Sequence, residues 1–307
     1  MSRRFMQLGD LDFSAVGPAV PSHSSGPPQD ATSATIRAAA AAQALLMGGD
    51  ANLKAMPARE SILSVRHPLL KEVRRALEKA EPTPEGLTVI EGRHLLKEAL
   101  RGPAVVEMML APADWDAPAA RVRRIDVPET VLRQVASTES SPGVIALVRW
   151  PSWTLADLLA PPALVVVLDG VQDPGNAGTI LRSAEAFGAT GVVFRQGSVS
   201  VRNPKLLRAS AGSSFRLPTL AGNHELPLKL YAAHPHEGAA AAEVDWAQPC
   251  ALAVGSEAHG VSPALLGSAT PVRIPTGRVE SLNAAVAASI LLYQAAQCRR
   301  SAGVHNR

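Results

Sequence analysis

Three segments in the second half of the chain place small polar and charged side chains directly after hydrophobic runs typical of buried β-strands. They are residues 164–194 (LVVVLDGVQDPGNAGTILRSAEAFGATGVVF), 251–263 (ALAVGSEAHGVSP) and 272–293 (VRIPTGRVESLNAAVAASILLY). Open α/β sheets bind their ligands in the loops at the carboxyl ends of the strands. The segments therefore predict one site built from Asn, Arg, Glu and Ser side chains, which are groups that orient reactants and assist proton transfer.

In the first segment, a buried strand over residues 163–168 is followed by a Gly- and Pro-rich turn over residues 169–175. Asn176 then stands where a helix N-cap belongs, and apolar residues follow it at helical spacing. Arg182 falls off that apolar stripe. From position alone Asn176 is a structural cap and Arg182 a surface cation; the alternative is that both belong to the site.

The other two segments repeat the pattern of a strand, a polar turn and a helix. Gly255 permits the backbone to approach a ligand closely, whereas Glu257 either favours a nearby helix N-terminus or serves the site. Ser281 and Asn283 are rival N-caps for the helix that follows them. That helix is apolar on nearly every face, which predicts burial on all sides, and a dimer interface is the natural cover.

Composition and missing motifs exclude several other classes of protein. The chain carries a net charge of +3, has two cysteines and contains no apolar run near the ~20 residues of a membrane span. The lack of such a run predicts no membrane span. Two cysteines provide neither a disulfide framework nor a Cys-rich zinc pattern, so we also expect no metal site. The glycines of residues 165–178 do not follow the G-x-G-x-x-G spacing, and the P-loop, H-E-x-x-H and G-x-S-x-G patterns are missing.

Three motifs carry a resemblance to a known family: N-x-G-x-x-x-R at residues 176–182, G-S-E at 255–257 and S-L-N at 281–283. Together they resemble the SpoU/TrmH family of knotted, S-adenosylmethionine-dependent RNA 2′-O-ribose methyltransferases. The resemblance implies S-adenosylmethionine as cofactor and a homodimer, because sites in the family are completed across the subunit interface.

The resemblance also implies roles for individual residues. The catalytic group is Asn176, Arg182, Glu257, Ser281 and Asn283, and the main-chain contacts to the cofactor come from Gly255, Ile274 and Leu282. Glu257 is expected to orient other groups and not to take the proton. Arg182 is expected to lie at the ribose, either as a perturbed base or as a clamp for the 2′-oxygen and the adjacent phosphate. The loop at residues 275–279 is one residue shorter than the common family form, which leaves the adenine contacts open.

The region before the three motifs resembles the substrate-binding domain of the rRNA-modifying branch of the family, chiefly through EGRHLLKEAL at residues 91–100. Arg93 is a candidate phosphate contact there. Lys205 and Arg208, in a passage similar to the family's N-P-K…R-A-S-A-G, are candidate phosphate clamps. For all three residues the alternative is an ordinary solvated helix charge.

The sequence thus predicts an α/β protein with a C-terminal α/β-knot, trefoil-knotted around a mainly parallel sheet, and a small N-terminal α/β RNA-binding domain. The expected divisions are a low-complexity tail, a substrate domain, a linker and a SpoU-type domain, over residues 1–58, 59–149, 150–162 and 163–307. The expected function is 2′-O-ribose methylation of cytoplasmic RNA, with 23S rRNA favoured over tRNA. A tRNA methyltransferase and a non-catalytic ribosome-assembly factor on the same fold are the alternatives.

Overall fold

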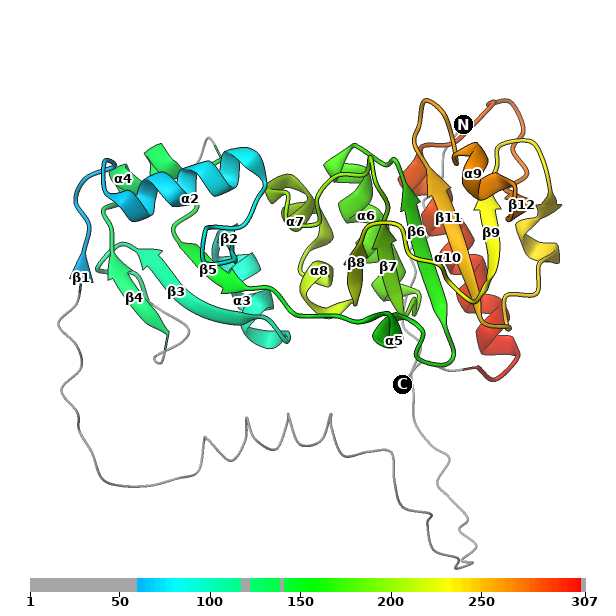
Figure 1. Ribbon diagram of the computed structural model, residues 1–307, viewed down its shortest axis with the longest axis horizontal. Coiled ribbons are helices and arrows are strands. Elements are labelled where there is room, and N and C mark those ends of the chain that lie inside the picture. Colours follow the sequence, from blue (N-terminus) through cyan, green and yellow to red (C-terminus); the bar gives the residue numbers. More distant parts are fainter. Residues whose placement is uncertain (1–59, 117–121, 139–140, 305–307) are drawn as a thin grey trace, which may run out of the picture. The chain divides into compact units, whose positions relative to one another are not determined.

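The computed structural model describes residues 60–116, 122–138 and 141–304 (Figure 1). The expected tail over residues 1–58 lies outside the described residues. Two β-sheets, each with its own helices, follow one another along the chain. The predicted α/β class with a large parallel sheet is confirmed.

The first sheet has five strands in the order β1-β4-β3-β5-β2. Their bounds are β1 Glu60–Ser61, β2 Leu87–Glu91, β3 Val105–Ala111, β4 Arg123–Asp126 and β5 Ile145–Arg149. β3 pairs with β4 in parallel and with β5 antiparallel, so this sheet is mixed. Helices α2 (Pro68–Lys79) and α4 (Glu129–Val135) pack on one face and α3 (Arg93–Arg101) on the other, because apolar residues point alternately to the two faces.

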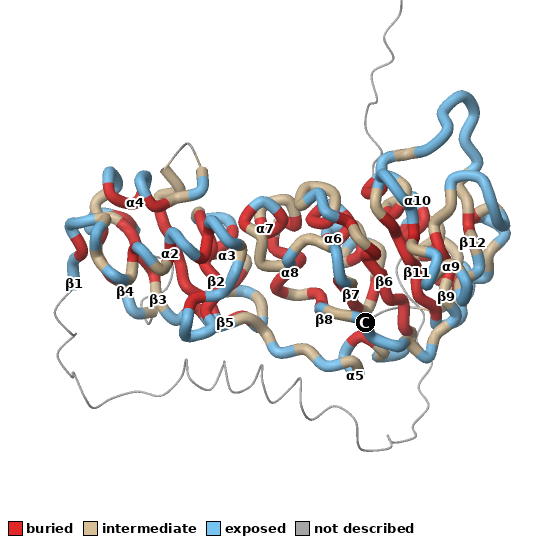
Figure 2. The backbone as a smooth tube through the Cα atoms, turned by 45° about the horizontal axis from the view of Figure 1, so that its top comes forward, coloured by how far each residue is buried: buried red, intermediate tan, exposed pale blue. Residues whose placement is uncertain are grey.

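The second sheet has seven strands in the order β10-β12-β9-β11-β6-β7-β8, and every pair is parallel. Their bounds are β6 Leu164–Asp169, β7 Gly191–Phe194, β8 Thr219–Ala221, β9 Lys229–Ala233, β10 Ala239–Ala240, β11 Cys250–Gly255 and β12 Thr270–Arg273. β6 and β11 are adjacent, central and buried throughout (Figure 2). Burial on both faces explains why their sequences are continuous hydrophobic runs.

Helices cover both faces of the second sheet. α6 (Pro174–Ala186) and α10 (Ala284–Ser301) pack on one face, and α5 (Leu155–Leu158) and α9 (Pro263–Leu266) on the other. α7 (Pro204–Ser210), α8 (Ser213–Arg216) and the short 3-10 turn η1 (Ala241–Glu243) complete the elements. None of the helices within the described ranges is long and apolar enough to cross a membrane.

A buried arginine fixes the last helix against the sheet. Arg299 is 4% exposed, and its guanidinium donates to four main-chain carbonyls at 2.7–3.1 Å, those of Pro162, Ala163, Trp246 and Gln248. These carbonyls lie before the starts of β6 and β11. Because a helix of this length spans about 27 Å, its first residues reach the opposite, carboxyl end of the sheet.

Candidate active site

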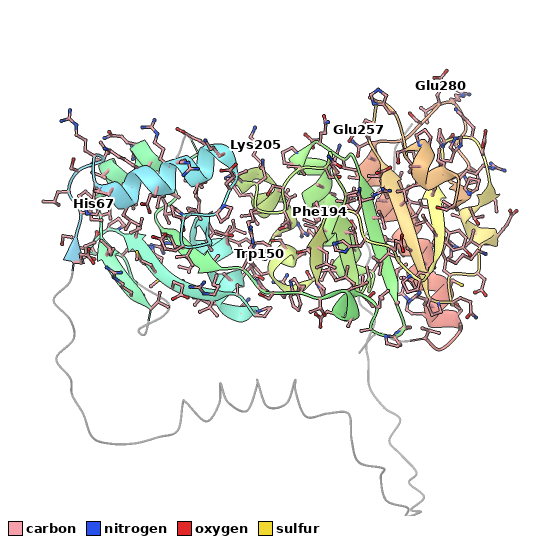
Figure 3. The ribbon with its side chains drawn as sticks, viewed as in Figure 1. His67, Trp150, Phe194, Lys205, Glu257 and Glu280 are labelled. Atoms are coloured by element: carbon pink, nitrogen blue, oxygen red, sulfur yellow. The ribbon has the colours of Figure 1, made fainter. Side chains whose placement is uncertain are left out.

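The three polar segments meet at the carboxyl end of the parallel sheet. β6 and β11 are in register up to their last residues, with Gly255 opposite Asp169. The loops that follow therefore start side by side. Figure 3 shows Glu257 and Glu280 at this end of the sheet.

Asn176 does not cap its helix. α6 begins at Pro174, and its N-cap is Asp173, whose Oδ1 accepts a hydrogen bond from the Asn176 main-chain nitrogen at 2.7 Å. The expectation of an N-cap at Asn176, drawn from position alone, is therefore wrong. Asp-Pro supplies the cap and the first helical residue, a common start for a helix. The carboxamide of Asn176 is thereby left for tertiary contacts.

A hydrogen-bonded chain joins one residue from each motif. Asn283 Nδ2 donates to Asn176 Oδ1 at 3.1 Å, and Asn176 Nδ2 donates to Glu257 Oε1. Asn283 is also the N-cap of α10, since its Oδ1 accepts from the first-turn main chain at 2.9 and 3.2 Å. The cap fixes which way this carboxamide faces. Its nitrogen is consequently directed at Asn176.

Beside this chain of hydrogen bonds lies a cavity of about 560 Å³, here called the three-loop cavity. Its walls come mainly from the ends of β9, β11 and β12 and the segments after them, at residues 233–236, 254–261, 272, 274, 276 and 280–284. The expected cofactor contacts Gly255, Ile274 and Leu282 line it, as do Glu257, Ser281 and Asn283. Its volume falls within the usual range for small-molecule sites.

Gly255 shapes this cavity through a close approach within the protein. A Cβ on it would lie 1.9 Å from the carbonyl carbon of Gly260. The turn is closed by paired main-chain hydrogen bonds between Ser256 and Gly260, at 3.1 and 2.9 Å. Only a glycine fits here, because the turn folds back onto its own backbone.

Arg182 lies away from the three-loop cavity. It is exposed on α6 and lines a second hollow of about 590 Å³ together with His94, Glu98, Glu185 and Arg216. Within one chain, the structure therefore brings Asn176, Glu257, Ser281 and Asn283 to one place and leaves Arg182 at another.

The three candidate phosphate contacts have different surroundings. Lys205 is exposed on α7 (Figure 3). Arg93 is exposed, with its guanidinium 5.2 Å from the ring centre of Trp115. Arg208 forms an ion pair at 3.3 Å with Glu91, whose side chain is 2% exposed. Arg208 therefore joins α7 to β2 of the first sheet and is not a free cation.

Comparison with known proteins identifies the family of this chain. Residues 163–293 match the SpoU rRNA Methylase family. The chain is 34% identical over 247 residues to the 23S rRNA (guanosine(2553)-2'-O)-methyltransferase RlmP of Bacillus subtilis strain 168, covering 76% of this chain and 98% of that protein. The chain belongs to the SpoU family.

Solved structures agree with this assignment to the SpoU family. The SpoU methyltransferase AviRb from Streptomyces viridochromogenes, in complex with AdoMet, superposes with a TM-score of 0.70 at 27% identity, covering 77% of this chain and 99% of that one. An RNA 2'-O ribose methyltransferase superposes with a TM-score of 0.64 at 34% identity, covering 78% and 99%.

Two parts of this SpoU-family site were missed by sequence reasoning. Asp169 is buried, and its Oδ2 accepts from the Ser262 main-chain nitrogen at 2.7 Å, which fastens the loop after β11 to the end of β6. An aspartate that closes a buried hydrophobic strand was the available signal. His234 and His236 line the three-loop cavity from the loop after β9, a short strand that had no such signal.

Proposed function

We propose that the protein transfers a methyl group from S-adenosylmethionine to the 2′-hydroxyl of a ribose in ribosomal RNA. One observation carries the proposal: the hydrogen-bonded chain Asn283–Asn176–Glu257 has both its ends in the lining of a cavity large enough for a nucleoside cofactor. Each of its members comes from a different motif. Family membership and the AdoMet complex of AviRb support the same chemistry.

The lining of the three-loop cavity fits S-adenosylmethionine. Apolar residues such as Ile274, Leu282 and Leu291 line it together with polar residues of the three loops, a mixture suited to a flat base and a ribose. The described lining residues include Glu257 and Glu280 but no lysine or arginine. A cavity without guanidinium or ammonium groups suits a ligand that carries a sulfonium charge.

Little covalent chemistry is left for the protein. The bound cofactor supplies a methyl group that is already electrophilic, so the protein's side chains position the ribose and help to remove one proton. Glu257 and Asn283 hold the Asn176 carboxamide in one orientation. A guanidinium donates hydrogen bonds and accepts none, so Arg182 binds the 2′-oxygen or a neighbouring phosphate.

A second copy of the chain is the proposed cover for α10. Val286, Ile290 and Tyr293 are 38–48% exposed and lie on one face of this helix. The N-cap of this helix, Asn283, lines the three-loop cavity, so a subunit packed against the helix adds groups to the site. Ile290→Glu should yield a monomer by light scattering, whereas Arg300→Glu at the exposed end of α10 should leave a dimer. Two dimers, or two monomers, would contradict the proposed interface.

We also propose the division of labour within the chain. Residues 59–149 bind RNA and residues 163–307 form the methyltransferase domain with the family's knotted backbone, joined by the linker 150–162. Two sheets with separate helices support the division. The 23S rRNA activity of RlmP favours rRNA as the substrate and the cytoplasm as the location.

The test is methyl transfer from labelled S-adenosylmethionine to unmodified 23S rRNA and tRNA, with the product mapped by resistance to alkaline cleavage. One new 2′-O-methyl site in 23S rRNA, lost in Asn176→Ala, is the expected result. A site in tRNA would change the substrate. Cofactor binding without any methylated RNA would instead support an assembly factor on the same fold.

A further inference from the structure

The second hollow of the molecule, here called the α3–α6 cleft, has walls from both halves of the described chain. His94 and Glu98 come from α3, Arg182 and Glu185 from α6, and Arg216 from the C-terminal end of α8. Its volume is about 590 Å³. The cleft thus holds the arginine that the proposed function assigns to the target ribose.

The carboxylates in the cleft are already neutralised. Arg216 donates through Nε and Nη2 to both oxygens of Glu185, at 2.6 and 2.9 Å, and through Nη1 to Glu98. Arg101 adds a second ion pair to Glu98 at 3.5 Å. Three guanidinium groups therefore face two carboxylates, and the remaining positive charge is that of Arg182. A phosphate entering the cleft meets no uncompensated carboxylate.

Two donors in the cleft are free. His94 and Arg182 are both exposed, and neither has a hydrogen-bond or ion-pair partner among the residues that the structure describes. Arg216 pairs with Glu98 on α3 and with Glu185 on α6, and these ion pairs hold the two helices in place. Glu98 lies four residues after His94 on α3, and Glu185 lies three residues after Arg182 on α6. Both donors are therefore presented on fixed supports.

We propose that the α3–α6 cleft binds a phosphodiester of the substrate RNA next to the nucleotide that is methylated, through His94 and Arg182. The proposal rests on the proposed RNA methyltransferase function and makes His94 an RNA-binding residue. Arg93, one position earlier, lies against Trp115 and does not line the cleft. Arg216 is a positioning residue, because it acts through the helices that carry the two donors.

The test compares His94→Glu with Lys97→Glu in the full-length protein. Lys97 is exposed on the same helix but outside the cleft, and its substitution changes the charge more. The probe is 23S rRNA transcribed in vitro, measured by filter binding across salt concentrations. His94→Glu should weaken binding about tenfold, because it loses a donor and places a carboxylate beside Arg182 in the cleft. Lys97→Glu should stay within about twofold at physiological salt, where exposed charges are screened.

Equal binding by the two variants, whether both weak or both near wild type, would overturn the assignment. S-adenosylmethionine affinity measured by calorimetry should be unchanged in both, which shows that they are folded. Should His94→Glu lose cofactor binding, His94→Gln replaces it, with an expected loss in RNA affinity of about threefold. If wild-type protein binds the RNA but methylates none, the proposed function fails, while the RNA affinities still decide the role of the cleft.

Discussion

The three-loop cavity and the α3–α6 cleft, about 560 and 590 Å³ in volume, take their walls from different parts of the chain. The cavity is formed by loops that leave neighbouring parallel strands, and turn geometry determines much of its shape. The cleft is formed by helices from both halves of the chain and is held by ion pairs. This difference predicts that substitutions in one should leave the ligand of the other largely unaffected.

Arg182→Ala is expected to have the largest effect, a loss of methyl transfer without a loss of cofactor binding. Methyl transfer should fall by about 10²- to 10³-fold or more, because the group assigned to the target ribose is lost. S-adenosylmethionine affinity should stay within about twofold, since Arg182 does not line the three-loop cavity. Single-turnover kinetics and calorimetry measure the two quantities, with Arg300→Ala as a surface control. Turnover near the wild-type rate would remove Arg182 from the site.

Gly255→Ala is expected to affect the other site, by weakening the binding of S-adenosylmethionine in the three-loop cavity. The new Cβ meets the backbone of Gly260 at 1.9 Å, so the turn that walls the cavity must open. We expect S-adenosylmethionine affinity to fall by about tenfold or more, since the bound conformation of the loop is lost. Gly277→Ala is the matched control, because a Cβ there has nothing within 4 Å. Equal cofactor affinities of the two variants would contradict the argument.

Arg216→Ala should change the cleft without affecting the cavity. Removing the guanidinium leaves Glu98 and Glu185 without their shared partner, so phosphate is repelled and the helices lose a link. The KM for RNA should rise about fivefold, and stability should fall by about 1 kcal/mol, because the pairs are partly exposed. Arg133→Ala breaks an exposed pair with Glu129 and should change neither. A rise in the KM for S-adenosylmethionine would show that the two sites are coupled.

The same difference between cavity and cleft explains which parts of the structure could be predicted from the sequence. The strands that end at Asp169 and Gly255 are continuous hydrophobic runs, and the breaks after them are local, so these two strands and their loops could be predicted. The loop after β9, which brings His234 and His236 to the cavity, follows a short strand and could not. The N-cap of α6 was assigned to Asn176 because Asp173 and Asn176 both stand before the apolar residues that recur at helical spacing. Only the backbone shows that the helix begins at Pro174.

The α3–α6 cleft could not be predicted because its contacts are distant in the chain. Arg216 is 31 residues from Glu185 and 118 from Glu98, and no local pattern marks either pair. For the same reason Arg208 looked like a free cation, since its partner Glu91 is 117 residues away. Charged side chains can be located from the sequence, but their partners are determined by tertiary packing.

The smallest expected effect is a change in folding stability at low pH, and it should depend on the Arg216–Glu185 pair of the cleft. The hydrogen bonds from Arg216 hold the pKa of Glu185 below its ordinary value of 4.5. A carboxyl whose pKa is lower in the folded than in the unfolded protein stabilises the fold above the unfolded value, and this contribution disappears as pH falls through the folded pKa. The stability difference between wild type and Arg216→Met should therefore be constant from neutral pH down to about 4.5 and shrink below it. Urea unfolding at a series of pH values measures this difference. A difference that stays constant into stronger acid would mean that Arg216 stabilises the cleft by packing alone, with no contribution from the charge of Glu185.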